Sequence, residues 1–271
     1  MKKNTQIAVA VAAVVIILGG LAAYFLWQPS PPKPAAIQVQ APPPPPPPPP
    51  KPEVRQVLEA PPAAPPPLPT LAGSDSFMLD ALAGLVGNKS LMKLFHTERI
   101  IRNIVATIDN LPRRRAPMSV MPVERAPGQF IIAGTEDDPA ISPKNAARYM
   151  PYVRIAEAVD AKKLVGLYVR LYPLFQQAYE ELGYPKKYFN DRLVVAIDNL
   201  LAAPDIKEPV KLVRPSVYYK YADPDLEERS IGQRILMRIG SKNRVIIKGK
   251  LREIKQELLL HMREKKVEVA G

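Results

Sequence analysis

Apolar residues recur at helical spacing through most of the chain beyond residue 70. The clearest stripe, with spacing i, i+4 and i+7/8, consists of Ile100, Ile101, Ile104, Val105, Ile108 and Leu111. A stripe of this kind is typical of an amphipathic helix with one buried face. Because the same spacing recurs between capping residues along the rest of the chain, the pattern predicts a mainly α domain of seven or eight helices.

Capping residues set the expected helix boundaries. Asp160 precedes a long apolar run as a helix N-cap and Gly183 follows it, with a kink expected at Pro173. Ser142 and Pro143 open another helix, which is expected to bend or restart at Pro151. The expected helices are 75–86, 88–95, 100–111, 143–149, 160–182, 188–201, 225–239 and 241–266.

At most two or three short strands are expected beside these helices. Residues 112–143 are irregular, with six prolines and an arginine triplet at 113–115. Within this segment, residues 130–133 read as a short strand, and residues 217–221 are a second candidate. A connection of this length either carries function or lies on the helical surface as a hairpin.

One apolar segment occurs twice. Residues 105–111 and 194–200 match at five of seven positions, and each copy ends a helix-period run. The copies predict two core helices, each with a carboxylate, Asp109 or Asp198, at the border of its apolar face. A half-buried carboxylate needs a donor such as an arginine or a tyrosine hydroxyl. The alternative is that the two acids converge as a catalytic pair or a cation site.

The first 27 residues predict a membrane anchor. Residues 7–27 carry no charge and are long enough, at about 1.5 Å per residue, to cross a hydrocarbon core of about 30 Å. Lys2 and Lys3 place residues 1–6 in the cytoplasm, and Tyr24 and Trp27 suit the far interface. The competing interpretation is a cleaved signal peptide, although the apolar run is longer than one requires.

Residues 28–69 predict a spacer rather than a packed segment. Twenty of the 41 positions from 29 to 69 are proline, including nine in a row. Proline tracts adopt the stiff polyproline II helix at about 3.1 Å per residue, so the spacer could hold the domain 70–271 up to about 120 Å from the bilayer. A ligand for a proline-binding groove is the alternative.

Four segments of the chain resemble a family of bacterial membrane-anchored envelope proteins catalogued only as a domain of unknown function. They read RYMPY at 148–152, LYPLFQQAYEELGY at 171–184, FNDRL at 189–193 and ADPDLE at 222–227. The resemblance covers residues 68–255, and the anchor and linker stand in the family's usual order. It implies a bacterial origin and a single-pass anchor, and it implies no activity, cofactor or catalytic residue.

Enzymatic chemistry is hard to assemble from these residues. The chain has no cysteine, and its two histidines, His96 and His261, lack partners at metal-ligand spacing. We therefore predict no catalytic, cofactor-binding or metal-binding residue. An aromatic stripe at helical spacing is interpreted as core packing; an exposed platform for glycan or peptide, extended by Tyr184 and Tyr188, is the alternative. The stripe consists of Tyr168, Tyr172, Phe175 and Tyr179.

The positive charge is concentrated near the C-terminus. Residues 234–266 hold 11 basic and 3 acidic residues, a net charge of +8. Four cations run along one side of the last expected helix, and this side is either a solvated face or a docking surface for an anionic partner. They are Arg244, Lys248, Arg252 and Lys255. The apolar stripe beside them predicts either a packing face or a coiled-coil seam through which the chain dimerises; it consists of Ile247, Leu251, Ile254 and Leu258.

These observations predict a single-pass inner-membrane protein that presents a non-enzymatic helical interaction domain in the periplasm. The expected partner is a protein or an anionic polymer of the cell envelope, and the predicted compartment disfavours nucleic acid. Two alternatives stay open. One is an envelope glycan- or ligand-processing enzyme that uses Asp109 and Asp198, and the other is a structural tether that dimerises through its last helix.

Overall fold

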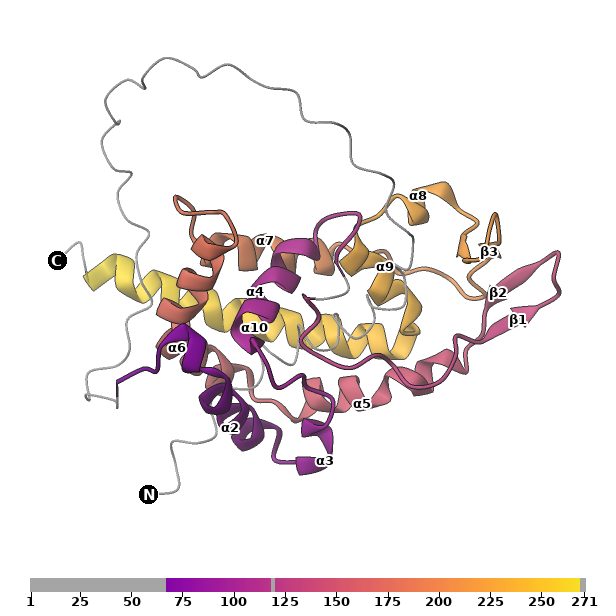
Figure 1. Ribbon diagram of the computed structural model, residues 1–271. Helices are drawn as coiled ribbons and strands as arrows, with labels where there is room; N and C mark the ends of the chain where they lie inside the picture. Colours follow the sequence, from indigo (N-terminus) through magenta and orange to yellow (C-terminus); the bar gives the residue numbers. More distant parts are fainter. Residues whose placement is uncertain (1–66, 118–119, 269–271) are drawn as a thin grey trace, which may run out of the picture.

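Helix α10 (Ser241–Glu268) runs through the middle of the fold, and α5, α6, α7 and α9 pack against it (Figure 1). The computed structural model describes residues 67–117 and 120–268. Within them the fold is mainly α, as predicted. The other helices are η1 (Leu71–Gly73), α2 (Asp75–Val86), α3 (Lys89–Met92), α4 (Ile100–Asn110), α5 (Asn145–Ala158), α6 (Ala161–Glu181), α7 (Phe189–Leu201), α8 (Pro224–Glu227) and α9 (Ile231–Arg238).

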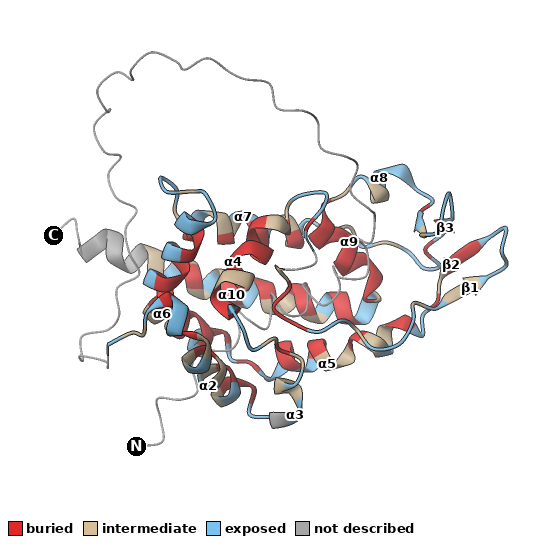
Figure 2. Ribbon diagram, viewed as in Figure 1, coloured by how far each residue is buried: buried red, intermediate tan, exposed pale blue. Residues whose placement is uncertain are grey.

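The apolar stripe of α10 lies in the core of its own chain. All four of its predicted members are at most 3% exposed, and buried residues of α4, α7, α9 and α10 gather in the middle of the fold (Figure 2). The packing-face interpretation is therefore confirmed. The coiled-coil seam is wrong, because these side chains are covered within one chain and are not accessible to a second copy. The four side chains are Ile247, Leu251, Ile254 and Leu258.

The aromatic stripe of α6 is also core, as predicted. Tyr168 contacts Phe175 edge-to-face with ring centroids 5.3 Å apart, and Phe175 stacks on Phe189 of α7 at 5.8 Å. Tyr168 donates a hydrogen bond of 2.5 Å to Asn190 Oδ1, which satisfies a hydroxyl that is wholly buried. These contacts fix the start of α7 against α6.

The doubled segment forms two helices, α4 and α7, that pack on each other. Their equivalent leucines, Leu111 and Leu200, meet at Gly232 of α9. A Cβ atom at Gly232 would lie 2.6 Å from Leu200 Cδ2 and 3.0 Å from the carbonyl oxygen of Leu111. The amide of Gly232 donates to that carbonyl at 3.0 Å. The close approach of α9 to both helices therefore requires glycine at this position.

The helix count exceeds the prediction, because the described residues contain nine α-helices. The expected helix 225–239 is divided into α8 and α9 at Ser230, whose hydroxyl accepts a hydrogen bond from the Gln233 amide and so caps α9. Helix α5 also continues through Pro151 without a restart. The buried Tyr152 and Val153, which follow the proline, hold this turn against the core and offset the lost backbone hydrogen bond.

Four strands occur in the described residues, which is more than the two or three expected. They form two antiparallel pairs, β1 (Ile132–Gly134) with β2 (Pro139–Ile141), and β3 (Leu212–Val213) with β4 (Lys220–Tyr221). The bridge between Ala140 and Lys211 joins the pairs. The expected segments 130–133 and 217–221 overlap β1 and β4. These two segments are rich in β-branched and aromatic residues, whereas β2 begins at a proline and β3 has only two residues, so β2 and β3 were missed.

The predicted anchor at 7–27 and the proline-rich linker at 28–69 lie outside the described residues, apart from the last three linker positions. In the described ranges, no helix combines the length and the apolar character needed to cross a bilayer.

Candidate functional site

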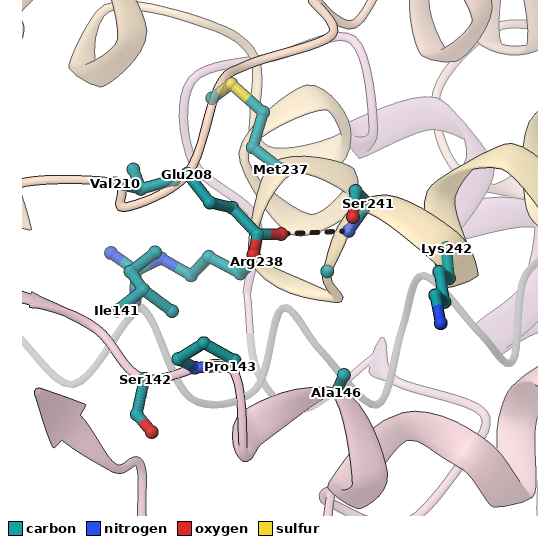
Figure 3. Close-up of a pocket in the computed structure, with 11 residues that line it drawn as sticks. Ile141, Ser142, Pro143, Ala146, Glu208, Val210, Met237, Arg238, Ser241 and Lys242 are labelled. Carbon is teal, nitrogen blue, oxygen red and sulfur yellow. Dashed lines mark hydrogen bonds between the residues drawn. The ribbon is translucent and has the colours of Figure 1, made fainter.

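One pocket on the described surface is a cavity of about 300 Å³ between β2, the start of α5, α9 and the start of α10. Figure 3 shows Glu208 reaching across it to the first turn of α10, where its Oε1 accepts a hydrogen bond of 3.3 Å from the Ser241 amide. The chain's own carboxylate therefore occupies the N-terminal end of this helix.

A buried arginine lines the same small pocket. The guanidinium of Arg238 lies 5.2 Å from the ring centre of Phe130 and 5.0 Å from that of Tyr221, and its Nε donates to the Tyr221 hydroxyl at 3.3 Å. Burial lowers the pKa of Arg238, and it raises the pKa of Tyr221. This network supports the second apolar core, formed by Val210, Leu212, Tyr221 and Met237 beneath the hairpins.

A second pocket, with a volume of about 470 Å³, lies where the C-terminal end of α4 meets the loop between α6 and α7. We call it the Asp109 pocket. Its lining carries four cationic side chains and two carboxylates, so that two positive charges are in excess. It is lined by Asp109, Arg113, Tyr179, Tyr184, Lys186, Lys187, Tyr188, Asp191, Arg192 and Val195.

The carboxylate of Asp109 holds two arginines in this pocket. Arg113 Nη2 donates to Asp109 Oδ2 at 2.6 Å, and Arg192 Nε lies 2.9 Å from Oδ1. The second contact is an ion pair without a hydrogen bond, since Arg192 Nε has no acceptor in hydrogen-bond geometry. The side chain of Asp109 is 6% exposed, whereas that of Arg113 is 46% exposed and that of Arg192 is 21% exposed. A buried acid therefore orients two cations that reach the surface.

The main chain of Asp109 reinforces this arrangement. Its carbonyl oxygen, in the last turn of α4, accepts from Arg113 Nε at 3.2 Å and from Arg192 Nη2. Carbonyl groups at a helix C-terminus lack intrahelical partners and carry partial negative charge, so guanidinium donors are favoured there. Each arginine is thus fixed through both the side chain and the backbone of one residue.

The loop between α6 and α7 contributes a tyrosine to the same network. Arg113 Nη2 donates to the Tyr184 hydroxyl at 2.6 Å, and that hydroxyl lies 3.3 Å from Asp109 Oδ2. Burial lowers the pKa of Arg113, but the hydrogen bond with Tyr184 and the charge of Asp109 outweigh this effect, so the net change is upward. Arg113 is therefore a cation at physiological pH.

The Tyr184 ring contacts another aromatic ring and a cation. It stacks on Tyr179 with centroids 4.6 Å apart, and Lys187 Nζ lies 5.5 Å from its centre. Burial raises the pKa of Tyr179, and the negative charge of Asp109 adds to that rise. The platform suggested for the α6 stripe is therefore wrong for the stripe itself, which is buried. Of the tyrosines that line the pocket, Tyr179 is 3% exposed, whereas the two added ones, Tyr184 and Tyr188, are half-buried.

One face of α7 supplies the other side of the pocket. Tyr188, Asp191, Arg192 and Val195 follow the spacing i, i+3, i+4, i+7 and line it together. Sequence reasoning missed this face because its members share no chemical type. The helical spacing of an aromatic, an acid, a cation and an exposed valine was the available signal, and Val195 is 50% exposed.

Asp198 does not join Asp109. It is a surface residue at the other end of α7, its side chain is 49% exposed, and it forms an ion pair with Lys255 of α10. It does not line the Asp109 pocket. The hypothesis that the two acids converge as a catalytic pair or a cation site is therefore wrong. No group of three or more His, Cys, Asp or Glu side chains suited to a metal occurs in residues 67–117 and 120–268.

The four cations of α10 do not form one exposed face. Arg244 and Lys248 have side chains that are 4% and 8% exposed, and both pair with Asp205 at 3.1 Å. Lys248 Nζ also donates to the carbonyl of Ala203 at 2.6 Å. Of the predicted set, Arg252 alone is exposed without an ion pair in the described chain, and Lys255 holds Asp198. The buried pair fixes the segment after α7 and is not a docking surface.

Comparison with known proteins identifies a family and no close relative. No curated protein and no solved structure is significantly similar to the chain. The family model described as "Protein of unknown function (DUF3014)" matches residues 100–255, a range that runs from α4 into α10 and contains the whole Asp109 pocket. The match spans more than half of the chain, which therefore belongs to the DUF3014 family of proteins of unknown function.

Proposed function

We propose that the helical domain is a non-enzymatic binding module and that the Asp109 pocket recognises an anionic group on a protein or polymer of the cell envelope. The observation that carries the proposal is the pair of arginines held by one buried carboxylate. Guanidinium groups bind carboxylate and phosphate oxygens with two parallel hydrogen bonds, and pre-oriented ones lose less entropy on binding.

The charge of the pocket supports binding rather than catalysis. Its two acids have different tasks, since Asp109 is neutralised by two arginines and Asp191 is exposed at the rim. The carboxylate of Asp109 is engaged by two arginines and so is not a free proton donor or acceptor, and neither histidine of the chain lines the pocket. The surplus of cations attracts an anionic partner over distances of about 8 Å at physiological ionic strength.

The proposed setting is the periplasmic side of a bacterial inner membrane. The uncharged run 7–27, preceded by Lys2 and Lys3, supports a single-pass anchor with a cytoplasmic N-terminus. The proline-rich residues 28–69 support a stiff spacer between the anchor and the binding module. In this setting the partner is an envelope component, and nucleic acid is not within reach.

Site-specific photocrosslinking in cells tests the proposal. A photoreactive amino acid at position 187, on the pocket rim, is expected to capture an envelope protein or polymer. The same amino acid at position 245, where Val245 is 66% exposed on α10 and does not line the pocket, provides the control. Adding Arg113→Gln to the position-187 protein is expected to reduce capture about tenfold, because one charge-assisted contact is lost.

Three results would contradict the proposal. Equal capture from positions 187 and 245 would show that the pocket is not the point of contact. Recovery of lipid alone would contradict a protein or polymer partner. Recovery of cytoplasmic proteins alone would contradict the periplasmic location of the domain.

A further inference from the structure

The two arginines of the Asp109 pocket keep free donors. Arg113 uses Nε and Nη2 for Asp109 and Tyr184, and Arg192 uses Nε and Nη2 for Asp109. Within the described residues, Nη1 of each arginine has no protein partner, although both side chains line the pocket. Each Nη1 carries two N–H groups, so four donors remain for a ligand beside the buried carboxylate.

The charge of the pocket selects among possible anions. Four cations line the pocket, the two arginines and the exposed Lys186 and Lys187, and the carboxylates of Asp109 and Asp191 offset two of these charges. Two positive charges in excess match the charge of about −1.5 to −2 that a phosphate monoester carries at neutral pH. A single carboxylate would leave half of this charge uncompensated.

Asp191 indicates what the rest of the ligand contains. This carboxylate lines the pocket next to Arg192, is exposed, and forms no hydrogen bond or ion pair within the described residues. A carboxylate accepts hydrogen bonds, so it favours a ligand with hydroxyl donors. It would repel the second acidic side chain of an acidic peptide. The pocket therefore combines arginine N–H donors, which bind an anion, with a neighbouring carboxylate that accepts hydrogen bonds from hydroxyl groups.

An aromatic face completes the arrangement. The Tyr184 ring is covered by Tyr179 and Lys187, but half-buried Tyr188 has no ring or cation contact among the described residues. Tyr188 and the exposed Val195 lie one turn on either side of Arg192 on α7. A tyrosine ring presents an apolar face with a polar tip, which suits the face of a sugar ring. The volume of about 470 Å³ is within the range of small-molecule sites.

We propose that the Asp109 pocket binds a phosphorylated sugar of an envelope glycan. The phosphate lies on Nη1 of Arg113 and Arg192, the sugar hydroxyl groups donate to Asp191, and the sugar ring covers Tyr188. This inference rests on the proposed function, because it names the ligand class of the same pocket.

Calorimetric titration of the detergent-solubilised full chain in phosphate-free buffer tests this inference. The probes are glucose 1-phosphate, glucose, inorganic phosphate, glucuronate and a hexaglutamate peptide. Glucose 1-phosphate is expected to bind at least about tenfold more tightly than each of the others, because only it engages the arginines, Asp191 and Tyr188 together. Relative to the wild type, Arg113→Gln is expected to weaken the binding of glucose 1-phosphate by a factor of about ten or more.

Two variants assign the contacts. Asp191→Asn, an exposed substitution that leaves the Asp109 network intact, is expected to weaken glucose 1-phosphate several-fold and to leave or improve the affinity for inorganic phosphate. Arg252→Gln on α10, outside the pocket, is expected to change neither the affinity for glucose 1-phosphate nor the affinity for inorganic phosphate. Circular dichroism checks that each variant is folded.

The outcomes separate this inference from the proposed function. Binding of hexaglutamate that depends on Arg113, without binding of glucose 1-phosphate, would overturn the assignment of a sugar phosphate as the ligand. It would still agree with an anionic protein as the partner. Equal affinity for inorganic phosphate and glucose 1-phosphate would overturn the sugar contacts. If glucose 1-phosphate fails to bind while position 187 still captures a partner that depends on Arg113, only this inference fails.

Discussion

Arg192 donates a hydrogen bond to the main-chain carbonyl of Asp109, although 83 positions separate the two residues. The same arginine lies against the carboxylate of Asp109, and Arg113 binds that carboxylate from the other side. The end of α4 is thereby joined to the start of α7 by charge as well as by apolar packing. This junction forms the floor of the candidate site, so its stability and its binding properties are linked.

Replacing Asp109 is expected to destabilise the domain much more than replacing Asp198. Asp109→Asn leaves two arginines around a buried neutral group, and we expect it to lower the unfolding free energy by about 2 kcal/mol. This loss is smaller than that of a fully buried ion pair because the Arg113 side chain is half exposed. Asp198→Asn breaks an exposed pair and should cost at most about 0.5 kcal/mol. Urea denaturation followed by circular dichroism measures both. Equal losses would show that Asp109 is not a structural centre.

The contact of Asp205 with Lys248 and Arg244 predicts a specific loss of stability in acid. The hydrogen bond and charge of Lys248, with help from Arg244, hold the pKa of Asp205 below its ordinary value of 3.8. Because the folded pKa is lower than the unfolded one, this stabilisation is fully present above about pH 4 and disappears as the pH falls through the folded pKa. The Asp205 contact therefore adds no pH dependence near neutrality.

Comparison of the wild type with Asp205→Asn measures this effect. The difference in their unfolding free energies is expected to be constant between about pH 5 and 7 and to shrink below about pH 4. In a Lys248→Met background, which keeps the volume of the side chain, the pH-dependent part of the difference should decrease. If the difference in unfolding free energy between the wild type and Asp205→Asn does not change with pH, the pKa of Asp205 is not lowered in the folded protein.

Gly232 and Gly249 are expected to respond to alanine in opposite directions. A Cβ at Gly232 would overlap Leu200 and press on the Leu111 carbonyl, so Gly232→Ala should cost about 1–3 kcal/mol of unfolding free energy. A Cβ at Gly249, inside α10, would meet nothing within 4 Å, so Gly249→Ala should stabilise the protein by about 0.5–1 kcal/mol. Thermal and urea unfolding of the two variants check the signs. A neutral Gly232→Ala would mean that α9 can move away from the doubled segment.

The local sequence alone predicted most of the helices because their signals are local. The apolar spacing in α4, the Asp160 cap of α6 and the left-handed Gly87 after α2 each act within about one turn of the backbone. The buried stripes of α6 and α10 were predicted for the same reason, since a period of 3.6 residues identifies the face that leaves water.

The tertiary structure decided how the polar residues at the borders of those stripes are used. Asp109 and Asp198 occupy the same position in the two copies of the doubled segment, yet the first is buried between two arginines and the second pairs with Lys255 at the surface. Arg244 and Lys248 looked like an exposed face, yet Asp205 and the carbonyl of Ala203 from another segment cover them. Periodicity determines which face of a helix is buried, whereas the partner of a border charge depends on which distant surface packs there. For that reason the sequence predicted the helices, and only the packing of α4, α6 and α7 brought together the Asp109 pocket.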